Sequence, residues 1–243
     1  MSPPTRRDDL AAGIGAVRRR IDAACSAAAR APGEITLVVV TKTYPADDVL
    51  LLAELGELNP GENRHPEGAR KAAACAEALA RSGGPQLSWH FVGALQTNKA
   101  APVAGYASWV HSVDRVRLVR ALDKGASNAE RTIDCLVQVS LDPPGAGEGR
   151  SGARPDEVRR VAEALADAGS LRLRGVMGVA PLDADPAPAF ARLQQVAARM
   201  REDHPAADVI SAGMSADLEQ AVAAGATHLR VGRAILGERP PLG

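Results

Sequence analysis

The sequence predicts an α/β fold: a single-domain, TIM-like (β/α)8 barrel that spans residues 1–243 and has an extra helix at its N-terminus. Short runs of β-branched and apolar residues alternate with longer stretches rich in Ala, Leu, Glu and Arg. Such alternation gives a parallel sheet with crossover helices. The length of 243 residues is close to the roughly 250 of a minimal barrel, and no low-complexity linker divides the chain.

The extra helix is expected over residues 8–30, and eight strand-like runs follow it. The strands are expected at 35–41, 58–61, 88–93, 108–112, 133–141, 171–179, 208–211 and 228–231. The helices are expected at 46–55, 66–81, 97–103, 116–127, 155–168, 188–201 and 216–224, with a final turn from Arg233. The second and seventh strands are short, and the second contains Pro60, so an open doubly wound sheet remains the alternative.

Composition argues against several classes of partner. Basic and acidic residues number 29 each, so a net charge of 0 gives no overall field that would attract nucleic acid or an anionic membrane. No stretch approaches the roughly 18 apolar residues of a membrane span, and the N-terminus lacks the apolar core of a signal peptide. Cys25, Cys75 and Cys135 have neither disulfide-framework nor metal-ligand spacing, so we expect reduced core thiols in a cytoplasmic protein.

Lys42 is the first candidate functional residue. The apolar run Ile35–Val40 continues directly into Thr41 and Lys42, which puts an amine where a buried strand reaches its carboxyl end. Barrels and open α/β sheets hold their chemistry at that end. A partly desolvated lysine can lose its proton well below its usual pKa of about 10.4 and attack an aldehyde as the free amine. The alternative is a lysine that only marks the exit of the strand into solvent.

Two strand-to-helix turns near the C-terminus form a candidate anion site. Residues 211–217 read SAGMSAD, and residues 230–234 read RVGRA. Unpaired N–H groups and the helix dipole bind anions at such turns, and barrels often hold phosphate after their last two strands. Ser215 adds a hydroxyl, Gly232 allows close approach, and Arg230 would point inward; an ordinary N-cap and a packing glycine are the alternatives for the first two. Pyridoxal 5'-phosphate (PLP) has both the aldehyde and the phosphate that Lys42 and these turns would bind.

Several motifs occur in order between residues 35 and 237. They are VTKT at 40–43, GEN at 61–63 with Glu67, WHFVGALQTNK at 89–99, HSVD at 111–114, RGVM at 174–177, GMSAD at 213–217 and RVG at 230–232. With these motifs the chain resembles the pyridoxal phosphate homeostasis proteins, also called the YggS or PROSC family. The fold of that family resembles the barrel domain of alanine racemase, which is PLP fold type III. The stretch at 89–99 is the most specific of the motifs.

The resemblance implies a set of cofactor-binding residues. Lys42 would carry PLP as an internal aldimine, and Arg230 would face the pyridine nitrogen and keep it unprotonated, which disfavours broad carbanion chemistry. Asn63 would contact the edge of the ring. The phosphate would be bound by Ser215 with the amides of Met214, Gly232 and Arg233. Relatives commonly have a threonine where Arg233 stands, so a hydroxyl donor is lost here while the backbone N–H remains. Pro60, Arg64 and His65 also depart from the family pattern, so the resemblance does not define the pocket wall beside Asn63.

For function, the resemblance implies a protein that acts in intracellular PLP (vitamin B6) homeostasis and delivers PLP to apoenzymes, without strong catalytic activity. A PLP-dependent amino-acid racemase is the main alternative, and a barrel that binds another phosphorylated metabolite without an aldimine, for which Lys42 would be incidental, is a further one. Two-base racemization needs acid–base groups on both faces of the substrate carbon. Alanine racemases take the second base from a tyrosine of a C-terminal domain, whereas this chain ends soon after its eighth strand and has only Tyr44 and Tyr106. We therefore expect a monomeric carrier with no catalytic residue.

Other polar residues receive weaker interpretations. His90 lies within an apolar strand, so a hydrogen-bonded core histidine that braces neighbouring strands is favoured over a catalytic base. The stretch 96–99 is expected to form a polar rim around the ligand, with a solvated helix start as the alternative. The Gly- and Pro-rich segment 142–153 is expected to be a lid or ligand-edge loop, or else a surface loop without a role. The histidines show no metal spacing, so no metal site is expected.

Overall fold

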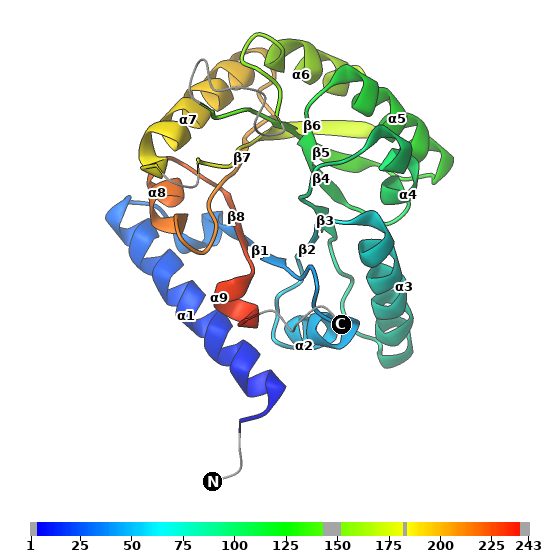
Figure 1. Ribbon diagram of the computed structural model, residues 1–243, viewed down its shortest axis with the longest axis vertical. Helices are drawn as coiled ribbons and strands as arrows, with labels where there is room; N and C mark the ends of the chain where they lie inside the picture. The colour runs from blue at the N-terminus through cyan, green and yellow to red at the C-terminus, as the bar shows by residue number, and fades with distance from the viewer. Residues whose placement is uncertain (1–3, 143–151, 182–183, 239–243) are drawn as a thin grey trace.

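The structure is a computed structural model that describes residues 4–142, 152–181 and 184–238. Eight parallel strands form a closed barrel in which each strand pairs with the next and the last pairs with the first. The strands are β1 (Thr36–Val40), β2 (Pro60–Glu62), β3 (His90–Phe91), β4 (Trp109–Val113), β5 (Ile133–Gln138), β6 (Leu171–Met177), β7 (Val209–Ser211) and β8 (His228–Val231). The predicted barrel is confirmed, and the open sheet is excluded (Figure 1).

Helices surround the barrel (Figure 1). They are α1 (Arg6–Ala27), α2 (Ala46–Glu54), α3 (His65–Ser82), α4 (Ala100–Ala104), α5 (Val116–Asn128), α6 (Val158–Ala166), α7 (Pro186–Asp203), α8 (Leu218–Ala223) and α9 (Arg233–Leu236), with 3-10 turns η1 (Pro32–Glu34) and η2 (Thr97–Lys99). The helix expected at 155–168 begins only at Val158, because residues 155–157 form a turn. The predicted lid falls mostly on residues 143–151, which lie outside the described residues.

The N-terminal helix α1 packs beside α8 and α9 (Figure 1). A Cβ added at Gly13 would lie 2.6 Å from the carbonyl oxygen of Ile235, so only glycine permits this close approach to α9. Arg20 of α1 donates to the carbonyl of Ser215 at 2.9 Å and pairs with Glu219 at 2.7 Å. The turn that precedes α8 and the helix α9 are thus contacted from outside by a helix that is not part of the βα repeat.

The large hydrophobic core lies between the strands and the helices, whereas the inside of the barrel is unusually polar. Alternate residues of β8 show the division, since Leu229 belongs to the large core while Arg230 is buried on the other face of the strand. The three cysteines are free and buried, as predicted. Within the described chain, no helix has both the length and the apolar character to cross a membrane.

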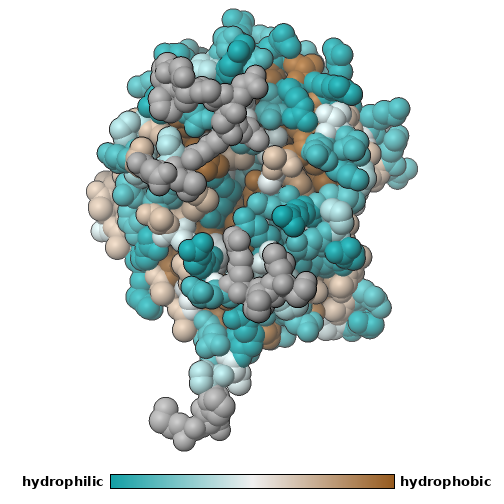
Figure 2. Space-filling view, viewed as in Figure 1, coloured by the Kyte–Doolittle hydropathy of each residue, from teal (hydrophilic) through white to brown (hydrophobic). Residues whose placement is uncertain are grey.

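Figure 2 shows hydrophilic residues over most of the face viewed in Figure 1, with hydrophobic residues visible between them.

Candidate functional site

Lys42 follows β1 at the carboxyl end of the barrel, as the sequence predicts, and its side chain is half-buried. The N–H of Thr41 donates to the carbonyl of Gly61 at 2.9 Å, which extends the β1–β2 pairing up to the residue before Lys42. Immediately afterwards Thr43 has φ of 72°. A β-branched residue rarely adopts this left-handed conformation, so the chain makes a constrained turn at Lys42.

A buried charged cluster adjoins this turn. The ammonium of Lys71, on α3, lies 2.6 Å from Oε1 of Glu62, 3.0 Å from Oε1 of Glu67 and 2.8 Å from the carbonyl oxygen of Thr41. The hydroxyl of Thr41 also donates to Glu62, at 2.7 Å. The carboxylate of Glu67 accepts the backbone N–H of Thr43. The side chains of Glu62 and Lys71 are only 1% and 5% exposed, so these ion pairs are shielded from water.

The pKa values of the two carboxylates of this cluster are shifted in opposite directions. Burial raises the pKa of Glu62, although the ammonium of Lys71 and the hydroxyl of Thr41 oppose that shift. Burial also acts to raise the pKa of Glu67, but the backbone N–H of Thr43 and the ammonium of Lys71 lower it overall. Glu67 is therefore the carboxylate that holds its charge most firmly.

A second buried network crosses the inside of the barrel. The guanidinium of Arg230 donates to Ser211 Oγ at 2.7 Å and to the carbonyl of Gly178 at 2.9 Å. Ser211 Oγ lies 2.9 Å from Nδ1 of His111, which is on β4 and so on the far side of the barrel from β7. His111 Nε2 is in turn 2.9 Å from His90 Nδ1. The predicted bracing role of His90 is confirmed.

The groups at the two ends of this network determine which atom donates and which accepts in each hydrogen bond. Arg230 can only donate, and Oδ1 of Asn59, 3.2 Å from His90 Nε2, can only accept. This assigns the proton of His90 to Nε2 and that of His111 to Nε2, and leaves the hydroxyl of Ser211 as the donor to His111. Burial lowers the pKa of both histidines well below the usual value, so the network is neutral up to Arg230.

Arg230 is the one cation of that network. Burial lowers its pKa to about 10, so the guanidinium remains protonated at neutral pH. In the part of the chain that the structure describes, it forms hydrogen bonds to a hydroxyl and a carbonyl but no direct ion pair, and the charge of Asp217 raises its pKa only at longer range. A buried cation without an ionic partner favours an electron-rich ligand atom beside it.

The two predicted phosphate turns lie side by side, because the N–H of Arg230 donates to the carbonyl of Gly213 at 2.9 Å. Gly213 has φ of 89°, and a Cβ there would lie 2.6 Å from Ala221 Cβ, so this turn requires glycine. A Cβ on Gly232 would lie 3.0 Å from the carbonyl oxygen of Val40, which places the β8–α9 turn against the strand that leads into Lys42. The structure thus brings Lys42 and both turns to one rim.

The other predicted cofactor-binding residues differ in their exposure and in whether their polar groups already have hydrogen-bond partners. The N–H of Met214 donates to Asp217 Oδ1 at 2.6 Å, so this amide already has a partner within its own turn. Ser215 is half-buried, and Arg233 is exposed as the first residue of α9. Asn63 is half-buried after β2, and its Oδ1 is enclosed without a hydrogen-bond partner among the described residues. An unpaired acceptor there is available to a ligand.

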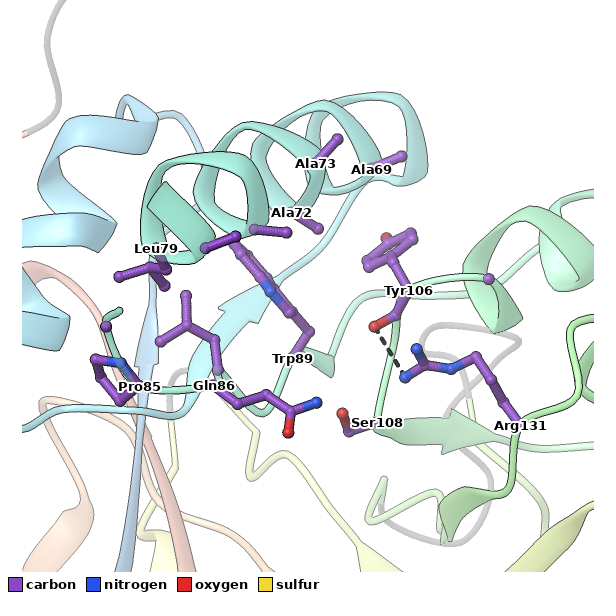
Figure 3. A pocket seen from close by; sticks show the side chains of 15 residues that line it. Ala69, Ala72, Ala73, Leu79, Pro85, Gln86, Trp89, Tyr106, Ser108 and Arg131 are labelled. Atoms are coloured by element: carbon purple, nitrogen blue, oxygen red, sulfur yellow. Dashed lines mark hydrogen bonds between the residues drawn. The ribbon is translucent and has the colours of Figure 1, made fainter. Parts of the chain in front are cut away.

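A separate pocket of about 500 Å³ lies between α3 and the segments that lead into β3, β4 and β5 (Figure 3), and so at the amino end of these strands. Alanines of α3 line it together with Trp89, Tyr106, Ser108 and Arg131, several of which directly precede β3, β4 or β5. The guanidinium of Arg131 is already engaged by the carbonyls of Tyr106 and Ala107, at 3.4 and 3.2 Å. This pocket does not contain any predicted site residue. Elsewhere in the described ranges, no group of three or more His, Cys, Asp or Glu could hold a metal ion.

Comparisons with known proteins agree on one family. A family model described as alanine racemase, N-terminal domain, matches residues 14–240. A pyridoxal phosphate homeostasis protein of Mycobacterium tuberculosis (strain ATCC 25618 / H37Rv) is 43% identical over 97% of this chain and 95% of its own length. One from Escherichia coli K12 is 34% identical over 96% and 97%. This chain belongs to the pyridoxal phosphate homeostasis protein family.

A solved structure of similar fold is that of PipY from Synechococcus elongatus PCC7942, with PLP bound. It is 30% identical, has a TM-score of 0.78, and the match covers 94% of this chain and all of that one. The match of this homeostasis-family chain to the alanine racemase N-terminal domain model includes Lys42 and both turns. The predicted family and fold are therefore confirmed.

Proposed function

We propose that this protein binds PLP at the carboxyl end of its barrel, holds it through a Schiff base with Lys42 and releases it as part of cellular PLP homeostasis. One observation carries the proposal: the rim has Lys42 and two candidate anion-binding turns close to Arg230, a buried cation that forms no direct ion pair among the described residues. The names of the relatives and the PLP in the PipY structure support the same ligand.

The covalent step uses Lys42 alone. The lone pair of its neutral amine would form a bond to the aldehyde carbon, and the carbonyl oxygen would leave as water with the two amine hydrogens. The imine nitrogen would then take one proton from solvent to give the protonated Schiff base. Arg230 offers N–H donors to the pyridine nitrogen, and its positive charge keeps that nitrogen unprotonated. The bound ring is then a poor electron sink, which suits storage of the cofactor better than catalysis.

For the phosphate, we propose the hydroxyl of Ser215 and the amides of Gly232 and Arg233. Met214 joins this set only if its N–H exchanges Asp217 for the ligand, since that carboxylate now accepts it. Asn63 has an unpaired acceptor for the edge of the ring. We further infer that the protein acts as a monomer in the cytoplasm and passes PLP to apoenzymes, and its free, buried cysteines agree with a reducing compartment.

Absorption spectroscopy tests the binding proposal. Wild-type protein mixed with PLP should show the visible band of a protonated Schiff base, and Lys42→Ala should lose that band. Lys124→Ala is the matched control, because Lys124 is an exposed lysine on α5 and should leave the band unchanged. A wild type that stays colourless after reconstitution would contradict the proposal.

A racemase would be detected by following D/L interconversion of alanine and other amino acids with the PLP-loaded protein. Turnover within the ordinary enzymatic range, about 1 to 1000 per second, would overturn the carrier assignment. Transfer is measured separately, as activity gained by a PLP-dependent apoenzyme mixed with loaded protein.

A further inference from the structure

The peptide units on both sides of the Lys42 Cα are held by charged side chains from one helix. The carbonyl of the Thr41–Lys42 peptide accepts the ammonium of Lys71 at 2.8 Å. The N–H of the Lys42–Thr43 peptide donates to the carboxylate of Glu67. Lys71 and Glu67 are four residues apart on α3 and pair with each other at 3.0 Å, so a single ion pair spans the backbone of Lys42.

This arrangement fixes a conformation that the chain would not adopt alone. Thr43 has φ of 72°, which is unfavourable for a β-branched residue and persists only where neighbouring contacts impose it. The bond from its N–H to Glu67 is such a contact. Glu62 completes the support, because its Oε1 accepts both the ammonium of Lys71 and the hydroxyl of Thr41.

A buried ion cluster is a costly way to obtain stability alone, since apolar residues of similar volume often serve as well. The cluster instead orients the backbone on both sides of Lys42, because each of its charged groups binds Thr41, Thr43 or another member of the cluster. With all three groups ionised it carries two negative charges and one positive, which leaves one net negative charge beside the Lys42 backbone.

We propose that Lys71, Glu67 and Glu62 form a clamp that positions Lys42 for bond formation with the aldehyde, and that Glu67 also contributes a negative charge that favours the protonated amine. The clamp residues are positioning residues and do not touch the cofactor. The inference rests on the proposed function of Lys42 as the PLP-binding residue.

The test compares two substitutions of Glu67, whose side chain is 24% exposed and can be replaced without leaving a fully buried gap. Glu67→Met removes the acceptor for Thr43, whereas Glu67→Gln keeps an oxygen that can accept the same N–H and lacks only the charge. The rate of Schiff base formation is measured by stopped-flow absorbance with PLP. Affinity for the rest of the site is measured with pyridoxine 5'-phosphate, which lacks the aldehyde.

Glu67→Met should slow bond formation at least about tenfold, because small misplacement of a reacting group has effects of that size. Its affinity for pyridoxine 5'-phosphate should stay within about threefold of wild type, a change of less than 1 kcal/mol. Glu67→Gln should restore most of the rate. Equal rates in wild type and Glu67→Met, or parallel losses with both probes, would overturn the clamp.

Cofactor-free protein gives an independent measurement. Competitive acetylation of Lys42, with Lys124 as the internal reference, reports the pH at which the Lys42 amine loses its proton. Removing the charge of Glu67 should move that midpoint to lower pH in Glu67→Gln, because a nearby negative charge favours the protonated amine. An unchanged midpoint in both Glu67 variants would contradict the electrostatic part of the proposal.

Two controls separate the possible failures. Arg18→Met breaks an ion pair with buried Glu57 near the amino end of β2, and should change neither the rate nor the acetylation midpoint. If wild-type protein binds pyridoxine 5'-phosphate but forms no Schiff base, the proposed role of Lys42 fails. The acetylation midpoint of Lys42 in the Glu67 variants is then the measurement that tests the clamp.

Discussion

Two buried polar networks adjoin the same rim, and they are built on opposite principles. The network inside the barrel runs from Asn59 through His90, His111 and Ser211 to Arg230, and it is neutral except for that last cation. The cluster on α3 contains a lysine and two glutamates whose charges meet one another. The first network ends on a cation that a ligand can pair with, whereas the charged groups of the second pair with one another and bind the backbone on either side of Lys42. The difference separates groups that bind from groups that position.

The largest effect on stability is expected from breaking the self-paired cluster. Lys71→Met leaves two carboxylates around a buried space, so it should lower the free energy of unfolding by about 3–5 kcal/mol. Chemical denaturation of the cofactor-free protein measures this. The double variant Lys71→Met with Glu62→Gln should recover part of the loss, and a wild-type midpoint for Lys71→Met would show that the cluster is not a charged unit.

The next largest effect is expected from acid, which should act on the buried histidines His228, His90 and His111, whose rings lie 5.1 to 6.2 Å apart. Burial lowers the pKa of His228 to about 4, whereas an exposed histidine in the unfolded chain has a pKa of about 6.5. Between these values the unfolded chain binds a proton that the folded protein excludes, so stability falls as the pH drops from about 6.5 to about 4. The slope from one such histidine approaches about 1.4 kcal/mol per pH unit.

His90 and His111 have lowered pKa values for the same reason and add to this acid sensitivity. Unfolding measured by denaturant at several pH values should therefore steepen below about 6.5, and His228→Gln should flatten the curve. A flat profile for the wild type would mean that the barrel histidines already carry protons when folded.

Arg230 should matter more for binding than for folding. Arg230→Leu removes donors from a charged group, and such bonds contribute about 1.5–3 kcal/mol, so affinity for pyridoxine 5'-phosphate should fall about ten- to hundredfold. Titration calorimetry measures this loss. The variant should still fold, because it also removes a buried charge that has no carboxylate partner among the described residues. An unchanged affinity would place Arg230 outside the binding site.

The smallest effect is expected from interrupting the neutral chain. Ser211→Ala leaves Nδ1 of His111 and one donor of Arg230 without their partner, and an unsatisfied buried polar group costs about 1–3 kcal/mol. Thermal unfolding should show a modest loss, and the affinity for pyridoxine 5'-phosphate should fall less than in Arg230→Leu. A larger loss than in Arg230→Leu would make Ser211 a direct ligand-binding residue.

The fold could be predicted from the sequence because alternation of strand and helix composition is a local property. Lys42, Gly232 and Arg230 could be placed at one rim for a related reason: each lies in or just after a parallel strand, and barrel closure brings the carboxyl ends of such strands together. Asn63, after the short β2, also reaches the same end of the barrel.

The charged cluster was missed because its members belong to different local patterns. Lys71 stands in an alanine-rich helix, where a lysine is ordinarily solvated. The only local signal of an ion pair is its spacing of four residues from Glu67. Its burial depends on the approach of α3 to β2, which no local pattern encodes. The bond between Met214 and Asp217 was missed similarly, since it depends on the geometry of a glycine turn.

The bond from Arg20 to the carbonyl of Ser215 joins residues 195 positions apart in the chain. During synthesis the segment that contains Lys42 leaves the ribosome long before the turns at 213–217 and 230–233 exist. Contacts of such long sequence separation form late in folding. We therefore expect that a nascent chain presents its reactive amine without a phosphate site, and that the capacity to retain cofactor arises only when the first helix closes against the last two turns.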